Sequence, residues 1–174
     1  MTELADKASL SATGLGNFFI QTPQNTILVT PQGFSGNALI PTSINSADLH
    51  VGFSETLTDF SIMVAPQDLN TPSPATMRVT AFMNGAVVGT STSTGSEPFF
   101  WDSSTLSFSA PQGFNSVAVH YDSPPPGASP EDYGQIFVAD NMIVTPVPEP
   151  SAGLLGALGI AGLLVCGRQR RKLC

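Results

Sequence analysis

The chain has 174 residues, of which 11% are charged, and its formal net charge is −7. The charge is unevenly divided: residues 1–150 hold two cations against all 13 acidic residues, a balance of −11, whereas residues 151–174 hold four cations and no acid. Nucleic-acid binding requires a cationic surface that displaces phosphate counterions, so nucleic acid is excluded as a partner of residues 1–150. This part also contains no cysteine, so it must fold on an apolar core without disulfides.

We expect residues 1–16 to be irregular or disordered. From residue 17 to residue 146, apolar and polar residues alternate in short segments, and helical periodicity is nearly absent. Residues 49–53 and 60–64 alternate in this way, which is typical of strands that place one face on a core.

The strongest local signal is a hairpin. Two alternating segments, Met77–Met83 and Ala86–Thr90, flank the dipeptide Asn84-Gly85. Asn-Gly accepts the positive φ angles of a type I′ turn, which joins antiparallel strands with the correct twist. The sequence therefore predicts two paired strands here.

Further alternation at 106–108 and 117–121 predicts two more strands, and residues 135–145 predict the last strand or pair. Between them, the prolines of residues 123–130 cannot donate to a ladder and predict an exposed loop. Eight or nine short strands separated by Gly, Pro and Asn indicate an all-β, antiparallel two-sheet sandwich of jelly-roll type over residues 17–146. The tetrapeptide Pro-Gln-Gly-Phe occurs at 31–34 and at 111–114, which we interpret as one turn used twice.

Aromatic residues offer a candidate binding site. Trp101, which follows Phe99 and Phe100, and Tyr133 could supply a flat platform for a sugar ring. The alternative is that these rings belong to the core or its rim.

Candidates for catalysis are few. His50 and His120 fall on the polar faces of expected strands without the spacing of a zinc site, and Ser35 lacks the glycines of a nucleophile elbow. Glu131 and Asp132 are adjacent in a proline-rich segment, where carboxylates are usually solvated. We therefore expect no enzyme activity; the alternative is a hydrolase or lyase that acts on extracellular glycans.

The C-terminal segment has a different character. Residues 152–167 contain no charge, and the cations Arg168, Arg170, Arg171 and Lys172 follow at once. As a helix, these 16 residues would span about 24 Å, somewhat less than the ~30 Å apolar core of a bilayer. Because cations stay on the cytoplasmic side, the segment predicts a short transmembrane helix with residues 1–150 outside the cytoplasm. The alternative is a buried helix of a soluble domain.

The order of these features resembles the PEP-CTERM sorting signal of Gram-negative bacteria. Pro148-Glu149-Pro150 looks like its signature tripeptide, Val147 and Ser151 match common flanks, and the apolar run and basic end follow within residues 147–174. The resemblance implies recognition, and cleavage near the tripeptide, by a membrane-embedded exosortase. It also implies delivery to the cell surface or an exopolysaccharide matrix after transient anchoring in the inner membrane.

Such export requires an N-terminal signal peptide with a cationic start and an apolar core of about 7–15 residues. Met1–Lys7 offers neither feature. We expect that the true start codon lies upstream; the alternatives are that the sequence was shortened or that export uses another route.

Residues 30–145 resemble the extracellular β-sandwich domains found before PEP-CTERM tails, which look like carbohydrate-binding jelly rolls. The resemblance is clearest in two segments, Ala47–Ser54 as an early core strand and Phe137–Val144 as the closing one. In calcium-bearing relatives an aspartate at the position of Asp140 can be a ligand. The resemblance therefore implies a possible calcium site at Asp140. Since calcium requires six to eight oxygens, the alternative is that Asp140 and Asn141 satisfy backbone groups at a strand bend.

Overall fold

A computed structural model describes residues 7–14, 16–42, 47–67, 75–95, 101–122 and 136–147. The elements in chain order are β1 (Ala8–Gly14), β2 (Phe18–Gln21), α1 (Pro23–Thr26), β3 (Ala38–Pro41), β4 (Ala47–Pro66), β5 (Thr76–Met83), β6 (Ala86–Thr94), β7 (Ser104–Tyr121) and β8 (Phe137–Pro146). All strand pairs are antiparallel, as the sequence predicts.

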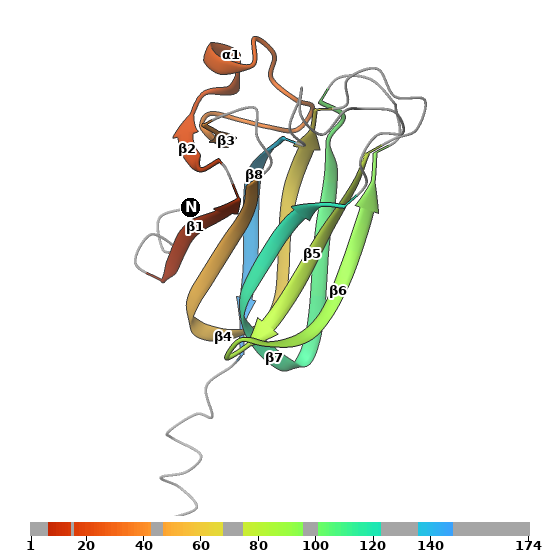
Figure 1. Cartoon of the computed structure of the whole chain (residues 1–174). Helices are drawn as coiled ribbons and strands as arrows, with labels where there is room; N and C mark the ends of the chain where they lie inside the picture. The colour runs from red at the N-terminus through yellow and green to blue at the C-terminus, as the bar shows by residue number, and fades with distance from the viewer. Residues whose placement is uncertain are drawn as a thin grey trace, which may run out of the picture.

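The two longest strands build the sandwich. β4 has 20 residues and β7 has 18, and both bend halfway so that each contributes to two layers (Figure 1). The front layer has the order β1, first half of β4, second half of β7, β5, β6. The back layer has the order first half of β7, second half of β4, β8, β3, β2.

The bends coincide. The β4–β7 register shifts between Gly52 and Leu57, and β7 turns within Pro111-Gln112-Gly113. Pro111 has no N–H for the ladder, and Gly113 adopts a φ of +80°, which suits glycine. We call this end of the sandwich, together with the β5–β6 turn, the bend end, and the opposite end the far end.

The main core fills the space between the layers. Alternate residues of the front layer point inward and meet alternate residues of the back layer, and all are fully buried or nearly so. The front layer contributes Leu49, Val51, Met77, Val79, Val117 and Val119, and the back layer contributes Phe60, Ile62, Val64, Leu106 and Phe137. A second cluster lies towards the far end and consists of Phe34, Ala38, Ile40, Ala65, Trp101, Ile136 and Val138.

The predicted sandwich and hairpin are confirmed, with two differences. The alternating segments 49–53 and 60–64 both belong to β4, and the segments 106–108 and 117–121 both belong to β7. In each strand the chain bends where the alternation breaks, but it does not leave the sheet. The expectation of an irregular 1–16 is wrong for Ala8–Gly14, which pairs with β4 over seven residues as an edge strand. β1 alternates Ala8, Leu10 and Ala12 with Ser9, Ser11 and Thr13, but its side chains are mostly small and exposed. Its backbone pairing with β4 is therefore what defines it.

The predicted loop 123–130 and the predicted transmembrane helix 152–167 lie outside the described residues. Within the described ranges, no helix has the length and apolar character needed to cross a membrane.

We predict that Gly113→Ala destabilises the sandwich more than Gly85→Ala. Both glycines have a positive φ, +80° and +84°, so alanine costs roughly 1–2 kcal/mol of backbone strain at either site. At Gly113 the new Cβ would also lie 2.4 Å from Thr56 Cγ2, whereas nothing lies within 4 Å at Gly85. Overpacking should add about 1–3 kcal/mol at Gly113.

Urea denaturation of both variants measures this difference. Thr56→Ser removes Cγ2 and should recover part of the stability lost in Gly113→Ala. Equal losses in the two glycine variants would contradict the tight contact between the bends.

Candidate functional site

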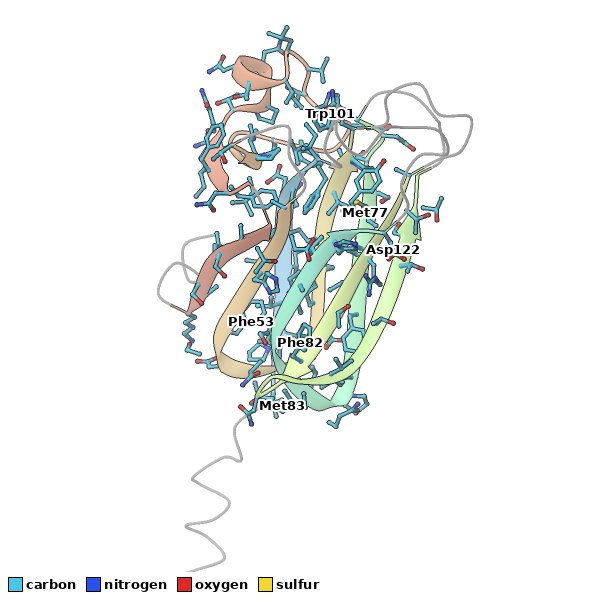
Figure 2. All side chains as sticks on the ribbon, viewed as in Figure 1. Phe53, Met77, Phe82, Met83, Trp101 and Asp122 are labelled. Atoms are coloured by element: carbon cyan, nitrogen blue, oxygen red, sulfur yellow. The ribbon has the colours of Figure 1, made fainter. Side chains whose placement is uncertain are left out.

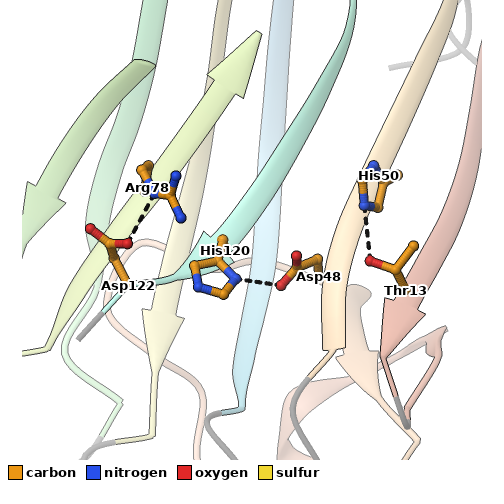
Figure 3. Close-up of polar contacts among 6 residues, drawn as sticks. All are labelled: Thr13, Asp48, His50, Arg78, His120 and Asp122. Atoms are coloured by element: carbon orange, nitrogen blue, oxygen red, sulfur yellow. Dashed lines mark hydrogen bonds and ion pairs between the residues drawn. The ribbon is translucent and has the colours of Figure 1, made fainter. Parts of the chain in front are cut away.

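The outer face of the front layer carries a row of polar side chains that contact one another. Register places Thr13 beside Asp48, His120 beside Arg78, and Arg78 beside Thr92, so one row of polar side chains crosses five strands. These side chains point outward because their neighbours in each strand, such as Leu49 and Val79, point into the core. We call this row, with His50 and Asp122, the outer polar row (Figure 3).

Its ionisable side chains are paired with one another. His120 Nδ1 lies 2.5 Å from Asp48 Oδ1, and Arg78 Nε lies 3.0 Å from Asp122 Oδ1. The four side chains are 35–38% exposed. Surface pairs of this kind contribute at most about 1 kcal/mol to stability, so their main effect is to fix polar groups in defined positions on a rigid sheet.

His50 Nε2 lies 3.0 Å from Thr13 Oγ1, which fixes the second histidine on the same face. Both histidines therefore occupy polar strand faces, as the sequence predicts. Within the described ranges, no group of three His, Cys, Asp or Glu side chains could hold a metal ion.

An open groove of about 400 Å³ lies nearer the bend end, between β1 and the bends. Lys7, Ser9, Gly52, Phe53 and Asn115 are among its lining residues. A Cβ at Gly52 would lie 2.8 Å from Ser9 Oγ, so glycine at this position leaves room for the Ser9 hydroxyl.

Asp140 and Asn141 join β8 to the turn at 33–35. Asp140 Oδ2 accepts a hydrogen bond from Ser35 N at 2.9 Å, and its Oδ1 accepts one from Asn141 N at 2.7 Å. Asn141, at a φ of +50°, donates from Nδ2 to Gly33 O at 2.9 Å. The geometry thus matches the alternative reading, in which these side chains satisfy backbone groups at a strand irregularity; calcium at Asp140 stays a prediction.

The aromatic candidates are not brought together by the described residues. Trp101 is only 9% exposed and packs in the second cluster at the far end. Met83 lies at the other end of the sandwich, the bend end (Figure 2). The Trp101 ring therefore serves the core and presents no free face for stacking. Tyr133 lies outside the described residues, as do Glu131 and Asp132.

Asp59 is a polar feature of the back layer. Its carboxylate accepts hydrogen bonds from Ser109 Oγ at 2.7 Å and Thr58 Oγ1 at 2.8 Å. These two hydroxyls, Ser109 first, lower the pKa of Asp59 below its ordinary value of 3.8. The bonds therefore favour the folded state above about pH 3.8, and this contribution is lost as the pH falls through the lower pKa of the folded state.

Sequence reasoning missed the contacts that organise the bend end. Asn84 N donates to Asn115 Oδ1 at 3.0 Å, and Asn115 Nδ2 donates to Asn84 Oδ1 at 2.8 Å. This reciprocal pair fastens the β5–β6 turn to β7. The only signal was the Asn-Gly dipeptide, which indicated the turn but not its partner 31 residues away.

Residues 146–172 match the family model of the PEP-CTERM protein-sorting motif. The chain thus carries this sorting signal, which implies processing by an exosortase and indicates an exported protein. The match begins at Pro146, the last residue of β8. No curated protein matches the chain.

Several solved structures share a general likeness with the described fold. The Agl-KA catalytic domain has 14% identity and a TM-score of 0.48 over 82% of this chain, but the match spans only 27% of its own length. The module CsCBM6-3 from Clostridium stercorarium, solved with cellobiose, has 17% identity and a TM-score of 0.41 over 82% of this chain and 91% of the module. At these values the likeness assigns no ligand to this chain.

We predict that Asp140→Ala lowers the free energy of unfolding by roughly 1–3 kcal/mol, because two backbone N–H groups lose a charged acceptor. Asp59→Ala is the matched control: its carboxylate also accepts two hydrogen bonds, but from hydroxyls that can turn to water. The control should lose less.

Thermal melts with calcium and with a chelator complete the test. We expect the melting temperature of the unmodified protein to be the same in both. A calcium-dependent rise that disappears in Asp140→Ala would show instead that Asp140 is a calcium ligand.

Proposed function

We propose that the protein is a non-catalytic component of the cell surface or extracellular matrix, whose acidic β-sandwich is delivered by its PEP-CTERM signal. The observation that carries this proposal is the junction at Pro146. There the last strand ends and the sorting motif begins, so the sandwich is complete before the signal starts. A processing protease can release a folded domain without unfolding it when the sorting motif lies outside that domain.

In this proposal residues 152–167 span the inner membrane transiently. The cations that follow, Arg168, Arg170, Arg171 and Lys172, remain cytoplasmic. The sandwich then lies outside the cytoplasm, where an exosortase acts close to Pro148-Glu149-Pro150. The net charge of −11 over residues 1–150 favours solubility after release.

We predict that Glu149→Gln blocks processing, whereas Glu55→Gln does not. Glu149 stands in the tripeptide, and Glu55 makes an exposed surface ion pair with Lys7 whose loss costs at most about 1 kcal/mol. The gene, with any in-frame sequence upstream of Met1, is expressed in the native host with and without the exosortase. The mass and location of each product are then compared.

The unmodified protein and Glu55→Gln should yield a shorter, released product only when the exosortase is present. Glu149→Gln should remain full-length and membrane-bound. A product of unchanged mass and location in both hosts would overturn the sorting proposal.

A second candidate function is polysaccharide binding through the outer polar row. Its support is the fixed arrangement of donors and acceptors on an open, rigid face, which suits hydroxyl groups. Because the domain is strongly acidic, an anionic chain would be repelled. We therefore expect a neutral glycan.

We predict that a glycan array detects neutral polysaccharide and that Asp48→Asn with Arg78→Gln weakens binding at least several-fold. The matched control, Asp59→Asn with Ser109→Ala, changes a polar pair on the opposite layer and should bind normally. Binding should survive a chelator. Release of shortened sugars during incubation would favour the alternative, a glycan-active hydrolase or lyase, and absence of any binding would remove this candidate.

A further inference from the structure

The chain leaves the sandwich at the bend end. Pro146 pairs with Leu57, and Val147 N donates to Thr56 O at 2.8 Å, so the last described contact of β8 is with the bend of β4. Gly113 packs against Thr56, and the Asn84–Asn115 pair brings the β5–β6 turn to the same end. These four segments form one surface around the exit point (Figure 1).

The connection from this exit to the apolar segment is short. Five peptide steps separate Val147 from Ala152, and a fully extended chain covers at most about 18 Å over that number. The second half of β4, from Leu57 to Pro66, alone spans roughly 30 Å. The tether is therefore shorter than the sandwich, and it holds the bend end close to the membrane.

The charges of the described residues permit the same orientation. Asp102, Asp122 and Asp140 lie towards the far end. Nearer the bend end lie Asp59, two residues from Leu57, and uncharged side chains such as Asn84 and Gln112. The ion pair of the bend end joins Glu55 to Lys7, one of the two cations of residues 1–150. Val87 and Val147, 64% and 39% exposed, add apolar surface at the same end. An anionic bilayer surface would thus repel the far end more than the bend end.

We propose that the bend end of the sandwich rests on the outer surface of the bilayer while the chain is anchored, with the far end pointing away. This inference rests on the proposed function, because it requires residues 152–167 to lie in the membrane. It names the lipid surface as the partner of the bend end. It also confines the tripeptide Pro148-Glu149-Pro150, and therefore the cleavage, to the vicinity of the bilayer surface.

The repeated tetrapeptide Pro-Gln-Gly-Phe supplies a matched pair of probes. Gln112 lies in the copy at the bend end and Gln32 in the copy near the far end, where Ser103 Oγ donates to Gln32 O at 2.6 Å. Both glutamines are exposed, and the glycines that follow them have φ values of +80° and +83°. A dye at either position is therefore attached to an exposed residue of the same tetrapeptide, one copy in the bend of β7 and the other in the turn at 31–34.

The full chain, with Cys166→Ser and Cys174→Ser, carries either Gln112→Cys or Gln32→Cys with a fluorescent label. It is reconstituted in vesicles of phosphatidylethanolamine and phosphatidylglycerol that contain headgroup spin labels. Flotation shows whether the chain is anchored, and fluorescence quenching reports proximity to the lipid. We expect quenching at 112 to exceed that at 32 roughly two-fold or more. Nine residues of nearly extended chain, roughly 30 Å, separate Gln112 from Ser103, which contacts Gln32.

The outcomes separate the two claims. If the chain floats but both positions are quenched equally, or position 32 more strongly, the orientation is wrong while the anchor stands. If the chain does not float, the anchor itself fails and the orientation fails with it. If position 112 is preferentially quenched only when the vesicles also contain the exosortase, the enzyme and not the lipid is the partner, which overturns the proposal.

A lengthened tether tests the cause. Twenty Gly/Ser residues inserted between Val147 and Pro148 can extend to roughly 70 Å, more than the length of the sandwich. The difference between positions 112 and 32 should then shrink. A difference of unchanged size would overturn the argument from tether length.

Discussion

The joint bend of β4 and β7 is the constraint on which the rest of this structure depends. The two strands are paired before and after their bends, so neither can turn without the other. Straight strands of 20 and 18 residues would give one sheet with a long apolar face exposed to water. Because both strands turn at the same level, that face closes on itself and buries side chains such as Val51 and Phe60. The contact of Gly113 with Thr56 shows how little space the turn leaves.

The same bend separates the surfaces on which function depends. It directs polar residues of β4, β5 and β7 outward, where register lines them up as the outer polar row. It also sends β8 back towards the bends, so that Pro146 ends beside Leu57. The candidate binding face and the attachment point of the sorting signal are therefore fixed by one feature of the fold.

Sequence patterns predicted what depends on neighbours along the chain. Alternation identified the strands, and Asn84-Gly85 identified the hairpin, because side-chain period and turn angles are local properties. Continuity through the bends was not predictable, since a break in alternation looks the same in a bent strand and in a loop. The partners of Asp140 and Asp48 lie 105 and 72 residues away, so only the fold could reveal them. The burial of Trp101 likewise depends on segments distant in sequence.

The sorting signal could be predicted from the sequence for a related reason. The signal consists of a tripeptide, an uncharged segment and four cations that follow one another along the chain. A membrane enzyme can therefore recognise it without any contact between distant residues. Ligand recognition by the sandwich depends instead on register between strands. The pairs Asp48–His120 and Arg78–Asp122 illustrate this, because each carboxylate meets a side-chain nitrogen that the fold brings beside it. The pairing orders the polar atoms, and the charges of Arg78 and Asp122 cancel. Such a face favours partners that exchange hydrogen bonds over partners that bring net charge, and this is the physical basis for expecting a neutral ligand there.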